Sequence, residues 1–165
     1  MQEILKDLVQ KARLKQAENK KYFQKLRKKK PKNLDSVMQD IHDEVFEYTD
    51  CLSCANCCKT TGPLLKDRDI ERLAKFLKMK SKVFIQQYLR IDEDNDYVFK
   101  EMPCVFLADD NYCLVYEARP KACREYPHLD RKKIFQIANL TVKNTEICPA
   151  VFDCVEILKE KIPLK

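Results

Sequence analysis

The sequence predicts an α+β, mostly helical protein, a small domain with one short β-hairpin and a basic N-terminal helical extension. Three observations support this fold class. Apolar residues recur at helical spacing over most of the chain, four cysteines crowd into residues 51–58, and strand-like patterns appear only between 97 and 116. We therefore expect two parts, a basic helical extension at 1–32 and a cysteine-cluster domain at 33–165.

The N-terminal segment is predicted to be one amphipathic helix. Its apolar residues recur every three or four positions, and Pro31 ends it after a run of lysines. Eleven Lys or Arg and three Asp or Glu give residues 1–30 a charge of +8, so the remaining residues carry −2 of the chain's +6. Such a segment favours contact with nucleic acid, the ribosome or an anionic surface. The alternative is a solvated helix packed by a narrow apolar stripe.

Helices are also expected at about 34–48, 67–77, 82–90 and 149–161, together with a short one between Pro120 and Pro127. The acidic residues at 92–96 indicate an exposed turn. Tyr97–Phe99 is expected to be a strand, and two further strands at 104–107 and 112–116 are expected to pair as the hairpin across the polar turn between them.

The cysteine cluster contains four thiols at spacings of three, three and one, namely Cys51, Cys54, Cys57 and Cys58. Thiolates are soft ligands for zinc or iron, and the C-x2-C-x2-C spacing also opens ferredoxin iron–sulfur sites. Adjacent side chains diverge by about 100° in a helix. We infer that Cys57 and Cys58 serve two different ions, or two atoms of one polynuclear centre.

Three later segments add thiols. Cys104 and Cys113 are expected on the two hairpin strands, and Cys123 on the short helix, where Arg119 and Arg124 would offset the negative charge of thiolates. Cys148 precedes Pro149 at a helix N-terminus, where a thiolate is favoured. Cys154 and His128 could add ligands. Cys154 lies on the apolar stripe of its helix and is expected to pack in the core, and His128 is expected not to be a ligand.

Composition narrows the function. Nine cysteines, no signal peptide and no apolar stretch of membrane-spanning length favour a cytoplasmic protein whose thiols stay reduced and bind metal. A single glycine, Gly62, argues against P-loop and dinucleotide sites, so no nucleotide cofactor is expected. Glu125, Tyr126 and His128 are the nearest catalytic candidates. They form no recognised catalytic arrangement, so an enzyme is not favoured.

The combined pattern resembles a known family. The cluster at 51–58, Cys104 and Cys113, Arg119-Pro120, and Cys123 with Pro127 are similar to the CxxCxxCC, or YkgJ-type, cysteine-cluster proteins, which are proposed to chelate zinc or iron. The resemblance covers residues 51–150. It implies a metal-binding domain whose ligands are Cys51, Cys54, Cys57, Cys58, Cys104, Cys113, Cys123 and Cys148. Flagellin lysine N-methylase carries a related pattern, which keeps a protein-modifying activity as an alternative.

Eight thiols divide into four and four, which suits two zinc ions, or one iron–sulfur cluster with one mononuclear ion. Zinc would act as a staple for an interaction module that contacts nucleic acid or ribosome through its basic helix. Iron–sulfur chemistry would serve oxygen sensing or electron transfer. The C-x2-C-x2-C start and the Cys148-Pro149 pair favour iron slightly.

Overall fold

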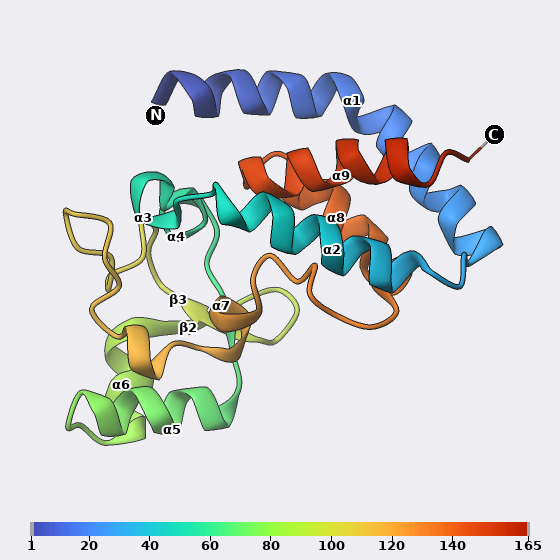
Figure 1. The fold of residues 1–165 in the computed structure, drawn as a ribbon. Coiled ribbons are helices and arrows are strands. Elements are labelled where there is room, and N and C mark those ends of the chain that lie inside the picture. The colour runs from blue at the N-terminus through green and yellow to red at the C-terminus, as the bar shows by residue number, and fades with distance from the viewer. Residues whose placement is uncertain (1, 165) are drawn as a thin grey trace. The chain divides into compact units, whose positions relative to one another are not determined.

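The computed structural model describes residues 2–164 as a mostly helical chain with a small sheet (Figure 1). The chain divides into two compact units. Unit 1 combines the chain up to Asp50 with the chain from Pro127 onward, and unit 2 is the continuous segment Cys51–Tyr126. Among the described residues, no helix is long and apolar enough to cross a membrane.

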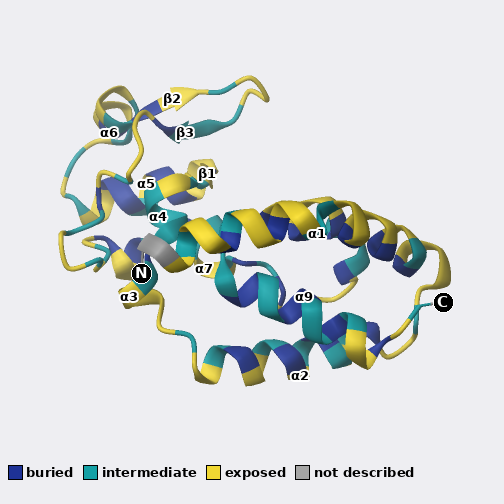
Figure 2. Cartoon of the chain, turned by 90° about the horizontal axis from the view of Figure 1, so that it is seen from above, coloured by how far each residue is buried: buried dark blue, intermediate teal, exposed yellow. Residues whose placement is uncertain are grey.

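Unit 1 is all helical. Its elements are α1 (Gln2–Lys29), α2 (Leu34–Glu47), the 3-10 helix η2 (Ile134–Ile137), α8 (Ala138–Asn144) and α9 (Pro149–Lys161). Helix α9 lies alongside α2, and α1 packs on α8 and α9. Buried residues recur along the facing sides of α1, α2 and α9 (Figure 2). Helix α8 and η2 were not expected from the sequence.

Helix α1 contributes directly to the core of unit 1. Leu8 and Ala12 of the expected stripe are buried, whereas Ile4 is exposed. The buried face continues beyond the expected stripe to Phe23 and Leu26, which join the side chains of α2 and α9 in one cluster. The lysines and arginine of its last turn are exposed. The division of the chain at residue 32 and the contact of residues 1–30 with nucleic acid stay predictions.

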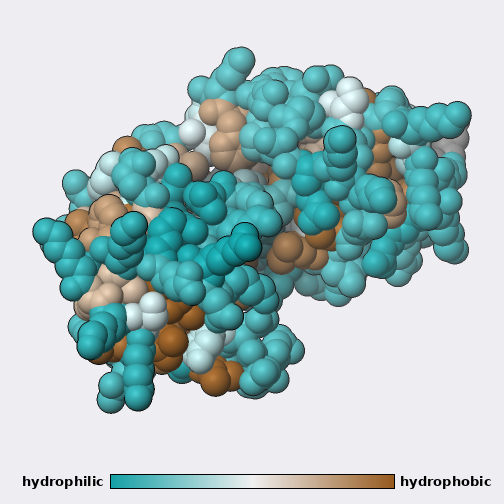
Figure 3. All heavy atoms as spheres, turned by 90° about the horizontal axis from the view of Figure 1, so that it is seen from below, coloured by the Kyte–Doolittle hydropathy of each residue, from teal (hydrophilic) through white to brown (hydrophobic). Residues whose placement is uncertain are grey.

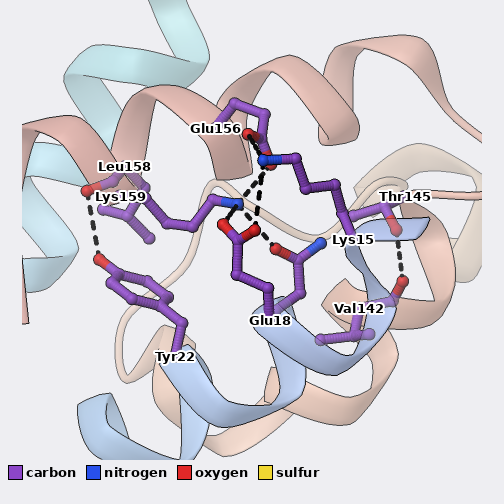
Figure 4. A network of polar contacts seen from close by, with 9 residues as sticks. Lys15, Glu18, Tyr22, Val142, Thr145, Glu156, Leu158 and Lys159 are labelled. Atoms are coloured by element: carbon purple, nitrogen blue, oxygen red, sulfur yellow. Dashed lines mark hydrogen bonds and ion pairs between the residues drawn. The ribbon is translucent and has the colours of Figure 1, made fainter. Parts of the chain in front are cut away.

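Polar contacts between α1 and α9 run beside this core (Figure 4). The partly buried Lys159 contacts the carboxylate of Glu18 through its ammonium group and donates to Asn19 Oδ1 at 3.0 Å. The hydrogen bond from Lys159 lowers the pKa of Glu18. Tyr22 Oη donates to the carbonyls of Leu158 and Ile162 at 3.2 and 3.0 Å, and burial raises the pKa of Tyr22 to about 12. Helix α1 is therefore oriented by specific contacts as well as by apolar burial.

Unit 2 holds the short elements and the sheet. Its elements are α3 (Cys51–Cys54), α4 (Asn56–Thr60), β1 (Leu64–Leu65), α5 (Asp67–Phe76), α6 (Ser81–Tyr88), β2 (Leu89–Ile91), β3 (Tyr97–Phe99), η1 (Tyr116–Ala118) and α7 (Lys121–Glu125). Phe84, Phe99 and Phe106 lie in its core. Other apolar side chains, such as Phe76 and Val83, are exposed, and apolar atoms reach the surface among hydrophilic ones (Figure 3).

The sheet is antiparallel, with β3 between β1 and β2. Strand β2 pairs Leu89 with Phe99 and Ile91 with Tyr97, so the observed hairpin encloses the acidic turn at 92–96. The carboxylate of Asp92 accepts the N–H groups of Asp94 and Asp96 at 3.0 and 2.9 Å. A side chain that caps its own turn in this way stabilises a tight reversal.

The hairpin expected at 104–107 and 112–116 forms only in part, since no regular strand is present there. That region holds a single antiparallel bridge, between Leu107 and Cys113. Two backbone hydrogen bonds flank the bridge, from the N–H of Leu114 to the Phe106 carbonyl and from the N–H of Ala108 to the Tyr112 carbonyl, both at 2.9 Å. Tight turns lie on either side, in which Leu107 donates to the Cys104 carbonyl at 2.9 Å and Tyr116 donates to the Cys113 carbonyl at 3.1 Å. The Cys104 carbonyl and the Tyr116 N–H, which a longer hairpin in this register would pair with each other, are used in these turns instead. The chain therefore bends at each of the two cysteines.

Candidate metal centre

The cysteine cluster forms two short helical turns. Helix α3 carries Cys51 and Cys54, and α4 carries Cys57 and Cys58. Ala55 joins them in the left-handed region at φ 47°, and its N–H donates to the Cys51 carbonyl at 2.8 Å. Left-handed backbone is costly for a residue with a Cβ. The buried Ala55 therefore marks the bend at which the cluster changes direction.

Backbone and side-chain bonds join this cluster to the segment that follows the sheet. The N–H of Cys104 donates to the carbonyl of Cys58 at 2.8 Å. Asn111 Nδ2 donates to the carbonyl of Leu52 at 2.7 Å. The N–H of Leu107 donates to the Cys104 carbonyl, and Leu107 also forms the bridge with Cys113. Cys104 and Cys113 therefore lie in one short segment held by local backbone contacts. Residues 46 and 59 positions apart in the sequence are thereby brought together within unit 2.

Helix α7 carries Cys123 and is held from α5 by two residues that sequence reasoning missed. Asp69 is buried, and its Oδ1 accepts the N–H of Lys121 at 3.0 Å. The guanidinium of Arg72 contacts Asp69 at 2.6 Å and also donates to the carbonyl of Arg119 at 2.7 Å. An aspartate in the first turn of a helix is common, because its charge stabilises the helix N-terminus. The sequence therefore gave no sign that Asp69 also binds the backbone of α7.

Four thiols lie close enough for their charges to act on one another, namely Cys58, Cys104, Cys113 and Cys123. We refer to these four as the grouped cysteines. Burial raises the pKa of Cys123 to about 12, and the charges on the other three raise it further. Burial likewise raises the pKa values of Cys104 and Cys113, with a contribution from Cys58.

Cys58 differs from the other grouped cysteines. A hydrogen bond from the Cys57 thiol, opposed by burial and aided by the charges of Arg119 and Lys59, lowers its pKa to about 7. The Cys58 thiolate therefore forms more readily near neutral pH than that of an ordinary cysteine, and its charge disfavours ionisation of its neighbours. Metal binding requires deprotonated thiols. A cation bound among the grouped cysteines would offset the repulsion between their thiolate charges.

The chemistry of these donors fits zinc or iron. Thiolates are soft ligands that suit both metals, and Cys54 and the grouped cysteines are free thiols rather than disulfide partners. Within residues 2–164, however, no three His, Cys, Asp or Glu side chains are arranged to hold one ion as they stand. The backbone brings the grouped cysteines together, and binding requires their side chains to rotate toward a common point.

The other expected ligands belong to different surroundings. Cys51 and Cys54 lie on α3 in unit 2. Cys148 belongs to unit 1, where it is the N-cap residue of α9 and its N–H donates to the Asn144 carbonyl at 2.9 Å. A ligand role for the full set of eight cysteines stays a prediction.

Cys154 packs in the core, as expected. It is 0% exposed within the cluster formed by α1, α2 and α9, and burial raises its pKa to about 12. Glu125 on α7 is exposed and pairs with Lys121 at 3.6 Å. His128 adopts a left-handed conformation at φ 66°. The structure thus gives Cys154 a packing role and Glu125 a surface ion pair.

Comparison with known proteins identifies the cysteine-rich region. A search of solved structures found no match. The sequence model of the CxxCxxCC family, described as "Putative zinc- or iron-chelating domain", matches residues 50–149, which is more than half of the chain. The match includes all of the grouped cysteines and ends just after Cys148. The chain therefore belongs to the CxxCxxCC family.

Proposed function

We propose that this chain binds zinc or iron through cysteine thiolates, with a centre built on the grouped cysteines. The observation that carries the proposal is the convergence of Cys58, Cys104, Cys113 and Cys123 from three separate segments of unit 2. Partly buried thiols whose thiolate forms would repel one another are costly to ionise without a cation. The family's description as zinc- or iron-chelating supports the same conclusion.

Four sulfurs complete a tetrahedral zinc site or one iron–sulfur cluster. The other thiols expected to be ligands, Cys51, Cys54, Cys57 and Cys148, stay candidates from the sequence alone. When bound, zinc would supply a structural cross-link, whereas an iron–sulfur cluster would supply electron transfer or oxygen sensing. The residues around the thiols supply charge balance and hold α7 in place. A cytoplasmic setting suits this function because thiols stay reduced there.

The direct test is metal analysis of protein purified without oxygen, together with its visible spectrum. Brown protein containing iron and sulfide would identify an iron–sulfur centre, and colourless protein with about two zinc ions per chain would identify zinc sites. Cys104→Ser should lower the metal content. Cys154→Ala is the matched control, because it removes a buried thiol that lies in the core of unit 1.

Two results would overturn the proposal. The first is wild-type protein that takes up neither iron nor zinc, whether isolated from cells or reconstituted under reducing conditions. The second is a folded Cys104→Ser variant with the same metal content as Cys154→Ala. Circular dichroism of both variants identifies loss of helix, so a folding failure is not read as a ligand effect.

A further inference from the structure

We propose that Arg119 is the positioning residue that supplies positive charge to the grouped cysteines and so sets how tightly they hold a metal ion. This inference rests on the proposed function. It assigns this role to Arg119 and not to Arg124, although both arginines have the same expected role from the sequence.

The first step is the place of Arg119 along the backbone. It lies between η1, which follows Cys113, and α7, which carries Cys123. The N–H of Tyr116 donates to the Cys113 carbonyl at 3.1 Å, and the N–H of Cys123 donates to the Pro120 carbonyl at 3.0 Å. One short turn therefore separates Arg119 from Cys113 on its N-terminal side, and another separates it from Cys123 on its C-terminal side.

The second step is the orientation of its side chain. Arg119 Nε donates to the carbonyl of Tyr116 at 2.9 Å. The guanidinium carbon lies 3.5 Å from the centroid of the Tyr116 ring, which places the cation over the face of the ring. Arginine stacks on an aromatic face while keeping hydrogen-bond donors at its edge. Tyr116 therefore holds the charged group in one direction.

The third step is the anchor of the backbone. The carbonyl of Arg119 accepts from Arg72 Nη2 at 2.7 Å, and Arg72 is paired with the buried Asp69. Helix α5 thereby fixes the point from which the Arg119 side chain extends. Hydrogen-bonded partners of this kind, which hold a charged residue in place, are typical of the surroundings of metal ligands.

The fourth step is the effect on the thiols. Four thiolates around a divalent ion leave a net charge of −2, and a nearby guanidinium offsets part of it. From its place between η1 and α7, the Arg119 side chain lies close enough to Cys58, Cys113 and Cys123 for its positive charge to act on them. Arg119 is half-buried, whereas Arg124 is exposed near the end of α7. The two arginines are five positions apart and provide a matched pair.

The experiment compares zinc affinity in wild type, Arg119→Gln, Arg119→Lys and Arg124→Gln, using competition with a chromophoric chelator under reducing conditions. Arg119→Gln should weaken zinc binding about 10- to 100-fold, the usual effect of losing a residue that supports metal ligands. Arg119→Lys keeps the charge and should recover part of this loss, whereas Arg124→Gln should bind like wild type. Raising the salt concentration should reduce the difference in zinc affinity between wild type and Arg119→Gln, since salt screens a partly exposed charge.

Equal zinc affinities for Arg119→Gln and Arg124→Gln would overturn the assignment of Arg119. A loss that is the same at low and high salt, and that Arg119→Lys does not recover, would also overturn it, because it would indicate a packing role. Failure of wild type to bind zinc or iron at all would instead refute the proposed function. Unfolding of the metal-free variants in urea checks that each is folded.

Discussion

Asp69 provides the sharpest test of how the fold supports the cysteines. Its side chain is 5% exposed and accepts three hydrogen bonds, from the N–H of Lys66 at 3.1 Å, the N–H of Lys121 at 3.0 Å and the guanidinium of Arg72 at 2.6 Å. Asp69→Ala leaves all three donors without this acceptor. Removing one partner of a buried charged pair costs about 3–5 kcal/mol. Asp69→Asn keeps one acceptor oxygen and should cost less, about 1–3 kcal/mol.

The assay is urea denaturation of the reduced, metal-free chain, followed by circular dichroism. Asp67→Asn is the matched control, because Asp67 begins the same helix but is exposed. Its effect should stay within about 0.5 kcal/mol. Equal stabilities for Asp69→Asn and Asp67→Asn would refute the argument that Asp69 holds α5 and α7 together.

The same carboxylate predicts a pH dependence. Burial would raise the pKa of Asp69, but the N–H groups of Lys66 and Lys121 and the guanidinium of Arg72 outweigh it, so its pKa is lowered. A lowered folded-state pKa stabilises the protein above the unfolded value of about 4. This contribution is lost as the pH falls through the lowered value. The difference in the free energy of unfolding between wild type and Asp69→Asn should therefore be largest near neutral pH and decrease in acid.

Three further predictions concern the core and the metal. Leu26→Ala should lower the free energy of unfolding by about 2–5 kcal/mol, because Leu26 is 0% exposed, whereas Leu14→Ala, at a position 79% exposed, should change little in the same urea assay. Cys154→Ser should lower stability by about 1–3 kcal/mol through burial of a hydroxyl, yet leave the metal content measured by elemental analysis unchanged. Removal of metal by a chelator should lower the unfolding temperature of wild type, and a Cys58→Ser variant should show a smaller drop.

The sequence predicted most of the helices because their signals are local. Apolar spacing, Pro31 and Pro149 identified α1, α2, α5, α6 and α9 to within a few residues. It also predicted the buried position of Cys154. The hairpin at 104–116 was overestimated because apolar runs around a polar turn resemble paired strands, although only one bridge forms there and tight turns follow at Cys104 and Cys113. Helix α8 was missed because its pattern is short and weakly periodic.

The sequence by itself determined which metal-binding groups this protein carries, since thiols at this number and spacing favour soft metals whatever the fold. Tertiary structure decided which thiols lie near one another. The grouping of Cys58 with Cys104, Cys113 and Cys123 depends on turns and backbone bonds between distant segments, and no local pattern encodes such contacts. It also decided that Asp69 and Arg72 hold α7, and that Arg119 rather than Arg124 acts on the thiols, because burial and direction exist only in the folded chain.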